Sequence, residues 1–112
     1  MSAAESRKDR RGRRVRVDCR LFLFGDDDFE LEARVIDLSA GGCSASCSEP
    51  VKSGMQFRLS LFLADQRWPV RIDGAVVRWV SGDQFGLEFF QLQPSIQERI
   101  RRYVREHPQH EV

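Results

Sequence analysis

Apolar and polar side chains alternate along much of this chain, and that period-two pattern constrains its fold more than any other feature. Every second residue is apolar over 15–23, and the alternation returns over 29–35 and 57–63. Successive side chains of a strand point to opposite faces, so each segment is typical of a strand with one buried face. Polar turns separate the segments, which predicts an antiparallel all-β domain, either a sandwich or a small closed barrel.

Further short segments are predicted to be strands, each ending at a polar or glycine-containing turn. They cover residues 43–47, 68–72, 75–80 and 85–90. Both tryptophans, Trp68 and Trp79, fall on these segments. On a strand, an indole side chain more often packs against the protein than contacts a ligand.

The end of the chain has a helical rather than a strand period. Apolar residues recur at Ile96, Ile100, Tyr103 and Val104, the spacing of one helix face. Ser95-x-x-Glu98 has the form of a capping box, which predicts that the helix begins at Ser95. We expect one amphipathic helix that closes the domain.

Charge is distributed unevenly over the 112 residues, although the net charge is only +1. Residues 1–16 contain seven bases and two acids, a net charge of +5, whereas residues 17–112 contain eleven bases and fifteen acids, a net charge of −4. The seven bases are Arg7, Lys8, Arg10, Arg11, Arg13, Arg14 and Arg16. A flexible basic arm, residues 1–14, on an acidic body predicts a local anion site rather than a broad nucleic-acid surface.

The composition also predicts the compartment. No apolar run is long enough to span a bilayer or to act as a secretion signal, so we expect a cytoplasmic protein without membrane insertion. The three cysteines fit a reducing compartment. Cys43 and Cys47 lie on the same side of one predicted strand, so they are expected to be buried core thiols rather than metal ligands.

A second motif follows the strand at 29–35, where the chain reads Asp37-Leu38-Ser39-Ala40-Gly41-Gly42. The two strands 15–23 and 29–35 are predicted to form a hairpin, whose free ends lie side by side. The turn at Asp37 should therefore meet the basic arm at Arg14. Acidic, hydroxyl and glycine residues beside arginines predict a nucleotide site.

The chemistry of each residue type supports that prediction. A guanidinium can hold a phosphate, hydrogen-bond to guanine, or stack on a purine. The Asp37 carboxylate can accept hydrogen bonds from the donor edge of guanine, and the Ser39 hydroxyl can bond a phosphate or a base. Gly41 and Gly42 are expected to allow close backbone approach and positive φ.

These motifs together resemble the PilZ domain family. The resemblance rests on Arg10-x-x-x-Arg14, on Asp37-x-Ser39-x-x-Gly42, and on the later segments Val76-Val77-Arg78-Trp79 and Phe85-Gly86-Leu87-Glu88-Phe89, and it extends over about residues 7–106. It implies a six- to seven-stranded Greek-key-like antiparallel β-barrel over residues 15–106, which includes a C-terminal α-helix, followed by a polar tail over residues 107–112. It also implies a receptor for cyclic di-GMP without catalytic activity.

Carried over by position, the resemblance assigns Arg10 and Arg14 to the phosphates and guanine, and Asp37, Ser39 and Gly42 to the base pocket. Arg11 and Gly41 are included as neighbouring ligand contacts, and Arg13 and Trp79 as possible ones. Arg7 and Arg11 have the same spacing as Arg10 and Arg14, so the arginine register stays open, as does binding of one or two ligand molecules.

The expected consequence of ligand binding is an ordered arm that changes the surface offered to an unidentified downstream protein. Two alternatives remain: a small barrel that binds nucleic acid, and a PilZ-like interaction module without a ligand. The acidic body argues against nucleic acid as the ligand. No arrangement of serine, cysteine or carboxylate beside a general base predicts an enzyme, and neither a cofactor nor a metal is expected.

Overall fold

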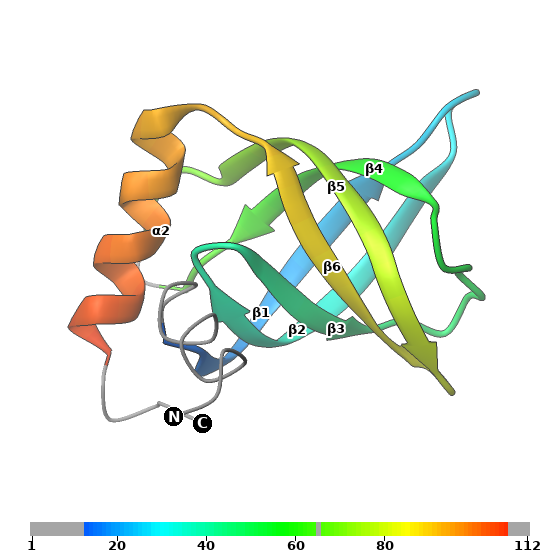
Figure 1. The fold of residues 1–112 in the computed structure, drawn as a ribbon, viewed down its shortest axis with the longest axis horizontal. Coiled ribbons are helices and arrows are strands. Elements are labelled where there is room, and N and C mark those ends of the chain that lie inside the picture. The colour runs from blue at the N-terminus through cyan, green and yellow to red at the C-terminus, as the bar shows by residue number, and fades with distance from the viewer. Residues whose placement is uncertain (1–12, 65, 108–112) are drawn as a thin grey trace, which may run out of the picture.

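The computed structural model describes residues 13–64 and 66–107, which form a closed six-stranded antiparallel barrel with one helix at its end (Figure 1). All six strands pair in an antiparallel manner. The elements are β1 (Val15–Phe24), β2 (Glu30–Ser39), β3 (Gly42–Ser46), β4 (Gln56–Phe62), β5 (Val70–Ser81), β6 (Gln84–Gln91) and α2 (Pro94–Glu106). The predicted fold class is confirmed.

The strand order around the barrel is β1-β2-β3-β6-β5-β4, and β1 pairs with β4 to close it. Strands that follow one another in the chain pair in four places, β1 with β2, β2 with β3, β4 with β5, and β5 with β6. The chain leaves this order once, between β3 and β4, because β3 pairs with β6 instead. This single crossover gives the Greek-key connection, and closure leaves no unpaired sheet edge.

Alternation along the strands places one set of side chains in the barrel interior. Residues 15, 19, 21 and 23 of β1 are buried, whereas residues 16, 18 and 20 between them are exposed. The core is built mainly from apolar side chains. Those least exposed include Phe85, Leu21, Leu23, Leu31, Leu38, Leu61, Ile72 and Ile100.

Residues 70–81 form one long strand, whereas the sequence predicted two segments over 68–72 and 75–80. The apparent break at Gly74 is an irregularity in the pairing of β5 with β6, not a turn. A glycine inside a strand often marks such a bulge or a close contact, and the Phe90 ring lies against Gly74. Trp68 lies before β5 in a loop, so its predicted strand position was wrong.

The helix α2 covers one end of the barrel, while the β1–β2 turn projects from the other end (Figure 1). Ile100, Tyr103 and Val104 are buried against the strands, as the apolar stripe predicted. The predicted capping box is wrong, because the N-cap is Gln93 and no side chain caps the helix. Pro94 fits the first helical position, which places Ser95 inside the first turn.

The part of the chain that the structure describes has no helix both long and apolar enough to cross a membrane.

Candidate functional site

The pairing of β1 with β2 brings the end of the basic arm to the Asp37 motif. Val15 lies opposite Leu38, and Arg16 lies opposite Asp37. The predicted meeting of the two regions is confirmed for Arg14, which immediately precedes β1. Arg10 and Arg11, and the competing position Arg7, lie outside the described residues, so their placement stays a prediction. Arg13 is described and exposed beside Arg14.

Arg14 and Asp37 form a long ion pair at the rim of the barrel. The Nη1 atom of Arg14 lies 3.6 Å from Oδ1 of Asp37, beyond hydrogen-bond distance. The Arg14 side chain is 51% exposed, whereas that of Asp37 is only 16% exposed. Oδ1 of Asp37 is buried, and no group in the described part of the chain forms a hydrogen bond with it. A buried polar atom without a partner costs about 1–3 kcal/mol, so this oxygen would gain from an added donor.

The Asp37 motif forms a tight hairpin between β2 and β3. Ser39 and Gly42 pair across it, and Ala40 and Gly41 form the two-residue turn. The buried Ser39 hydroxyl donates to the Gly42 carbonyl oxygen at 3.2 Å. The backbone N–H of Phe89 donates to the Gly41 carbonyl oxygen at 2.9 Å, which ties the turn to β6. The motif is therefore a fixed corner of the barrel.

The two glycines of this corner have different roles. A β-carbon at Gly42 would overlap the carbonyl oxygen of Leu87, so close strand packing requires glycine there. A β-carbon at Gly41 would meet nothing within 4 Å. Neither residue has a left-handed φ, so the expectation of positive φ was wrong. Close approach was the correct expectation for Gly42, because its neighbour is backbone that cannot move aside.

A row of paired residues extends from the Asp37 corner across the outside of the barrel. Asp37 on β2 pairs with Ser44 on β3, Ser44 pairs with Gly86 on β6, and Gly86 pairs with Trp79 on β5. The Trp79 indole lies directly over Gly86, where a β-carbon would clash with the ring, and the tryptophan is still 43% exposed. The row thus ends in an accessible aromatic face.

Sequence reasoning missed Ser44 and Gly86 as members of this row. Ser44 is one of only two polar residues classed as buried among the described residues, the other being Ser39. Gly86 carried a usable signal, since glycine within a strand often marks the close approach of another group. The pairing of β3 with β6 joins segments about forty residues apart, so alternation alone did not place Ser44 beside Gly86.

The thiols nearest to this corner face the barrel interior. Burial, reinforced by the charge of Asp37, raises the pKa of Cys43, and burial chiefly raises the pKa of Cys19 to about 11. All three cysteines are free and buried, as the sequence predicted for Cys43 and Cys47. A protonated, enclosed thiol is a poor nucleophile and a poor metal ligand. Over residues 13–64 and 66–107, no His, Cys, Asp and Glu side chains cluster to hold a metal.

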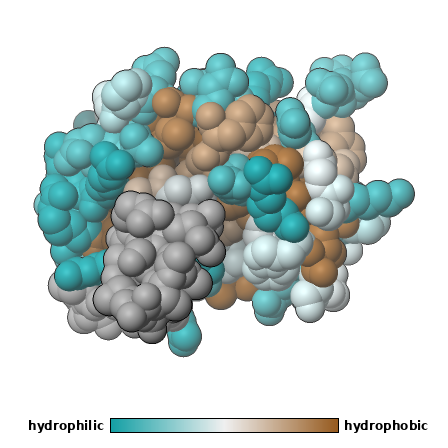
Figure 2. Space-filling model, in the orientation of Figure 1, coloured by the Kyte–Doolittle hydropathy of each residue, from teal (hydrophilic) through white to brown (hydrophobic). Residues whose placement is uncertain are grey.

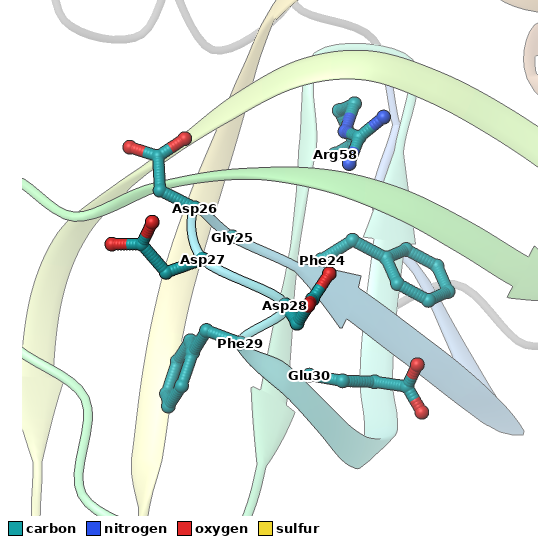
Figure 3. A pocket seen from close by; sticks show the side chains of 8 residues that line it. All are labelled: Phe24, Gly25, Asp26, Asp27, Asp28, Phe29, Glu30 and Arg58. Atoms are coloured by element: carbon teal, nitrogen blue, oxygen red, sulfur yellow. The ribbon is translucent and has the colours of Figure 1, made fainter.

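A cavity of about 360 Å³ lies elsewhere, at the β1–β2 turn, and is lined by residues 24–30 and Arg58. Figure 3 shows the carboxylates of Asp26, Asp27, Asp28 and Glu30 around this turn. Four carboxylates beside one arginine would repel an anionic nucleotide. The cavity is also at the other end of the hairpin from Asp37, so it is not the predicted ligand site.

Comparison with known proteins gives one family match. The family model described as PilZ domain matches residues 5–106 of this chain. No curated protein sequence matches the chain.

Several solved structures share the fold at low sequence identity. The Bacillus subtilis inhibitor of motility, MotI/DgrA, is 19% identical with a TM-score of 0.73, over 87% of this chain and 50% of that protein. The PilZ domain of Escherichia coli YcgR, solved with c-di-GMP, is 18% identical with a TM-score of 0.71, over 86% of this chain and 88% of that chain. The chain therefore spans half the length of MotI/DgrA and most of the isolated YcgR domain.

Proposed function

This chain belongs to the PilZ domain family, and we propose that it is a bacterial cyclic di-GMP receptor whose basic arm and Asp37 corner bind the ligand together. The observation that carries the proposal is the convergence of Arg14 and Asp37, with a buried Asp37 oxygen that lacks a donor. The solved YcgR domain with c-di-GMP supports it by analogy of fold.

Asp37 would read the guanine base. The N1–H and exocyclic amine of guanine are adjacent donors, and a carboxylate accepts from both. Adenine lacks this pair of donors. The buried Oδ1 atom would obtain in the complex a hydrogen bond that no described residue gives it, so base binding would remove a desolvation cost as well as add a contact.

Arg14 would bind the phosphates and stack on the base, in concert with Arg10 from the arm. The Arg14 side chain is half exposed, and among the described residues its ion pair with Asp37 is long, so it can turn towards an anion at little cost. Arg11 and Arg13 are secondary candidates for the same phosphates. Paired charge-assisted hydrogen bonds from arginine supply both affinity and geometry.

The remaining corner residues would shape the pocket. Ser39 already donates its hydroxyl proton within the hairpin, so towards the ligand its oxygen would act as an acceptor. Gly41 leaves open space, Gly42 brings β3 close to β6, and Trp79 offers a partly exposed ring at the end of the row. In this proposal the protein binds and signals, as PilZ receptors do, and performs no catalysis.

The arm would become ordered on the ligand and thereby alter the surface offered to a downstream protein. Ordering each arm residue costs about 1–2 kcal/mol, which the arginine contacts must offset. The conformational effect is thus tied to the same charges that bind the phosphates.

Isothermal titration calorimetry of the full chain tests the assignment. Cyclic di-GMP should bind the wild-type protein, and Arg14→Ala and Asp37→Ala should each remove detectable binding. Asp18→Ala and Arg34→Ala are matched controls, because that Asp–Arg pair also joins β1 to β2 but is exposed. Unchanged binding in the Arg14 and Asp37 variants would reject the pocket, and equal affinity for cyclic di-AMP would reject guanine reading by Asp37.

A further inference from the structure

The loop between β4 and β5 presents a highly exposed tryptophan. Trp68 is 69% exposed, more than any other large apolar side chain among the described residues. It follows the exposed Arg67 and precedes Pro69. Its position at the surface gives no stabilisation comparable to the burial of a core indole, so the fold does not explain it.

Arg99 of α2 fixes the backbone of this loop. Its Nε donates to Oε1 of Gln66 at 2.8 Å, its Nη1 donates to the Pro69 carbonyl at 3.2 Å, and its Nη2 donates to the Trp68 carbonyl. The helix that carries Arg99 is itself anchored by Ile100, which is fully buried. The guanidinium thus uses its fork to hold three acceptors of one loop, and Trp68 projects from a braced backbone.

Positive charge is concentrated around this loop and the helix. Residues 64–71 and 94–106 contain six arginines and three acids, a net charge of +3. The rest of residues 17–112 contains five bases and twelve acids, a net charge of −7. Arg102 is one turn beyond Arg99 on the same helix face. Figure 2 shows the outward surface of α2 as hydrophilic. Because Arg99 joins this helix to the loop, Trp68 is an exposed apolar residue next to a basic helix.

We propose that Trp68, Arg67 and Arg102 form a docking surface for a partner protein that offers an apolar socket rimmed by carboxylates. Tryptophan and arginine are the side chains most enriched at the energetic centres of protein interfaces. The braced loop lowers the ordering cost of binding, because its backbone is already fixed. The basic surroundings select an acidic partner and steer its approach.

A protein fits this surface better than a membrane does. Peripheral attachment to a bilayer needs a wide apolar face or a second anchoring signal. Here one indole stands among charged side chains on a rigid loop, an arrangement suited to a single socket. The proposal does not depend on cyclic di-GMP, because no residue of the docking surface belongs to the ligand site.

Peptide display on the immobilised full-length protein tests the proposal. We would select random linear peptides in the presence of excess soluble Trp68→Ala protein, which removes peptides that bind elsewhere. The selected peptides should be acidic and contain a large apolar residue. Their affinity, measured by fluorescence anisotropy of labelled peptide, should fall at least about tenfold with Trp68→Ala and with Arg67→Glu/Arg102→Glu.

Phe90→Ala is the matched control, because Phe90 is also an exposed aromatic residue, 51% exposed, on the barrel surface. It should leave peptide affinity unchanged, and thermal unfolding should show that every variant is folded. Failure to select acidic peptides, or equal binding to the Trp68→Ala protein, would overturn the proposal. Trp68-dependent binding to anionic vesicles, or a Trp68-dependent dimer in sedimentation, in place of peptide binding would also overturn it.

Discussion

Two Asp–Arg pairs join β1 and its preceding residue to β2, and they are built in opposite ways. Asp18 and Arg34 meet at 2.8 Å, with a second hydrogen bond at 3.1 Å, and both side chains are exposed. Arg14 and Asp37 stay 3.6 Å apart, and the carboxylate is largely buried with one oxygen lacking a partner. The pair with the better hydrogen-bond geometry, Asp18 with Arg34, is therefore the exposed one.

We propose that this difference separates a structural ion pair from one retained for a ligand. A surface pair with good geometry contributes about 0–1 kcal/mol to folding. A buried carboxylate without adequate donors is unfavourable, and proteins retain such groups where function requires them. Since both pairs link the same strands, strand pairing does not account for the contrast. We attribute it to the proposed ligand, which would complete the bonding of Asp37.

Exchanging the acid and the base within each pair should give the largest difference between the two pairs. Arg14→Asp/Asp37→Arg keeps one acid and one base at the rim, but places each on the wrong strand for phosphate and guanine. We expect its affinity for cyclic di-GMP to fall more than about 100-fold. Asp18→Arg/Arg34→Asp should bind as the wild type does. Calorimetry measures both, and binding retained by the Arg14/Asp37 exchange would mean that charge alone, not placement, matters.

Gly41 and Gly42, at the end of the Asp37 motif, allow a test of the tight hairpin that positions Asp37. Gly42→Ala should lower the free energy of unfolding by about 2 kcal/mol or more, because the methyl group would overlap the Leu87 backbone. Gly41→Ala should change stability by less than about 0.5 kcal/mol, since its position is open and its φ is not left-handed. Urea denaturation compares them, and a stable Gly42→Ala protein would contradict the tight strand packing.

Single substitutions in the arm can decide whether Arg10 and Arg14, or Arg7 and Arg11, form the arginine motif. If Arg10 acts with Arg14, Arg10→Ala should weaken cyclic di-GMP binding about tenfold or more through loss of charge-assisted bonds. Arg7→Ala removes the same charge from the same tract and serves as the control. Calorimetry at one ionic strength should separate them. A larger loss for Arg7→Ala would assign the phosphate contacts to Arg7 and Arg11.

The sequence predicted the features that depend on neighbours along the chain. Alternation indicated the strands, and hairpin geometry correctly predicted that Arg14 lies beside Asp37. Local patterns were less reliable for the bounds of elements, which depend on tertiary contacts. Gly74 resembled a break but lies inside β5, and the Ser95 capping box is replaced by Pro94 at the helix start.

Contacts between distant segments could not be predicted from these patterns. Ser44 meets Gly86 through the pairing of β3 with β6, and that register depends on barrel closure. Arg99 of α2 braces a loop more than thirty residues earlier in the chain. Periodicity identifies which face of an element is apolar, but not which distant polar group an arginine will reach.

The smallest expected effect is on the free energy of unfolding without ligand, and it should differ between the two pairs. Asp18→Asn should lower the free energy of unfolding by up to about 1 kcal/mol, because it weakens a well-formed surface ion pair. Asp37→Asn should leave stability unchanged or raise it by up to about 1 kcal/mol, since a neutral amide oxygen is less costly to bury than a carboxylate oxygen.

Urea denaturation of the ligand-free proteins would measure both changes, and calorimetry would show whether Asp37→Asn has lost cyclic di-GMP binding. A gain or no loss in stability together with lost binding would identify Asp37 as a residue retained for its ligand. If Asp37→Asn were instead destabilised by more than Asp18→Asn, the rim pair would be a structural contact after all. The contrast between the two pairs would then reflect folding rather than recognition.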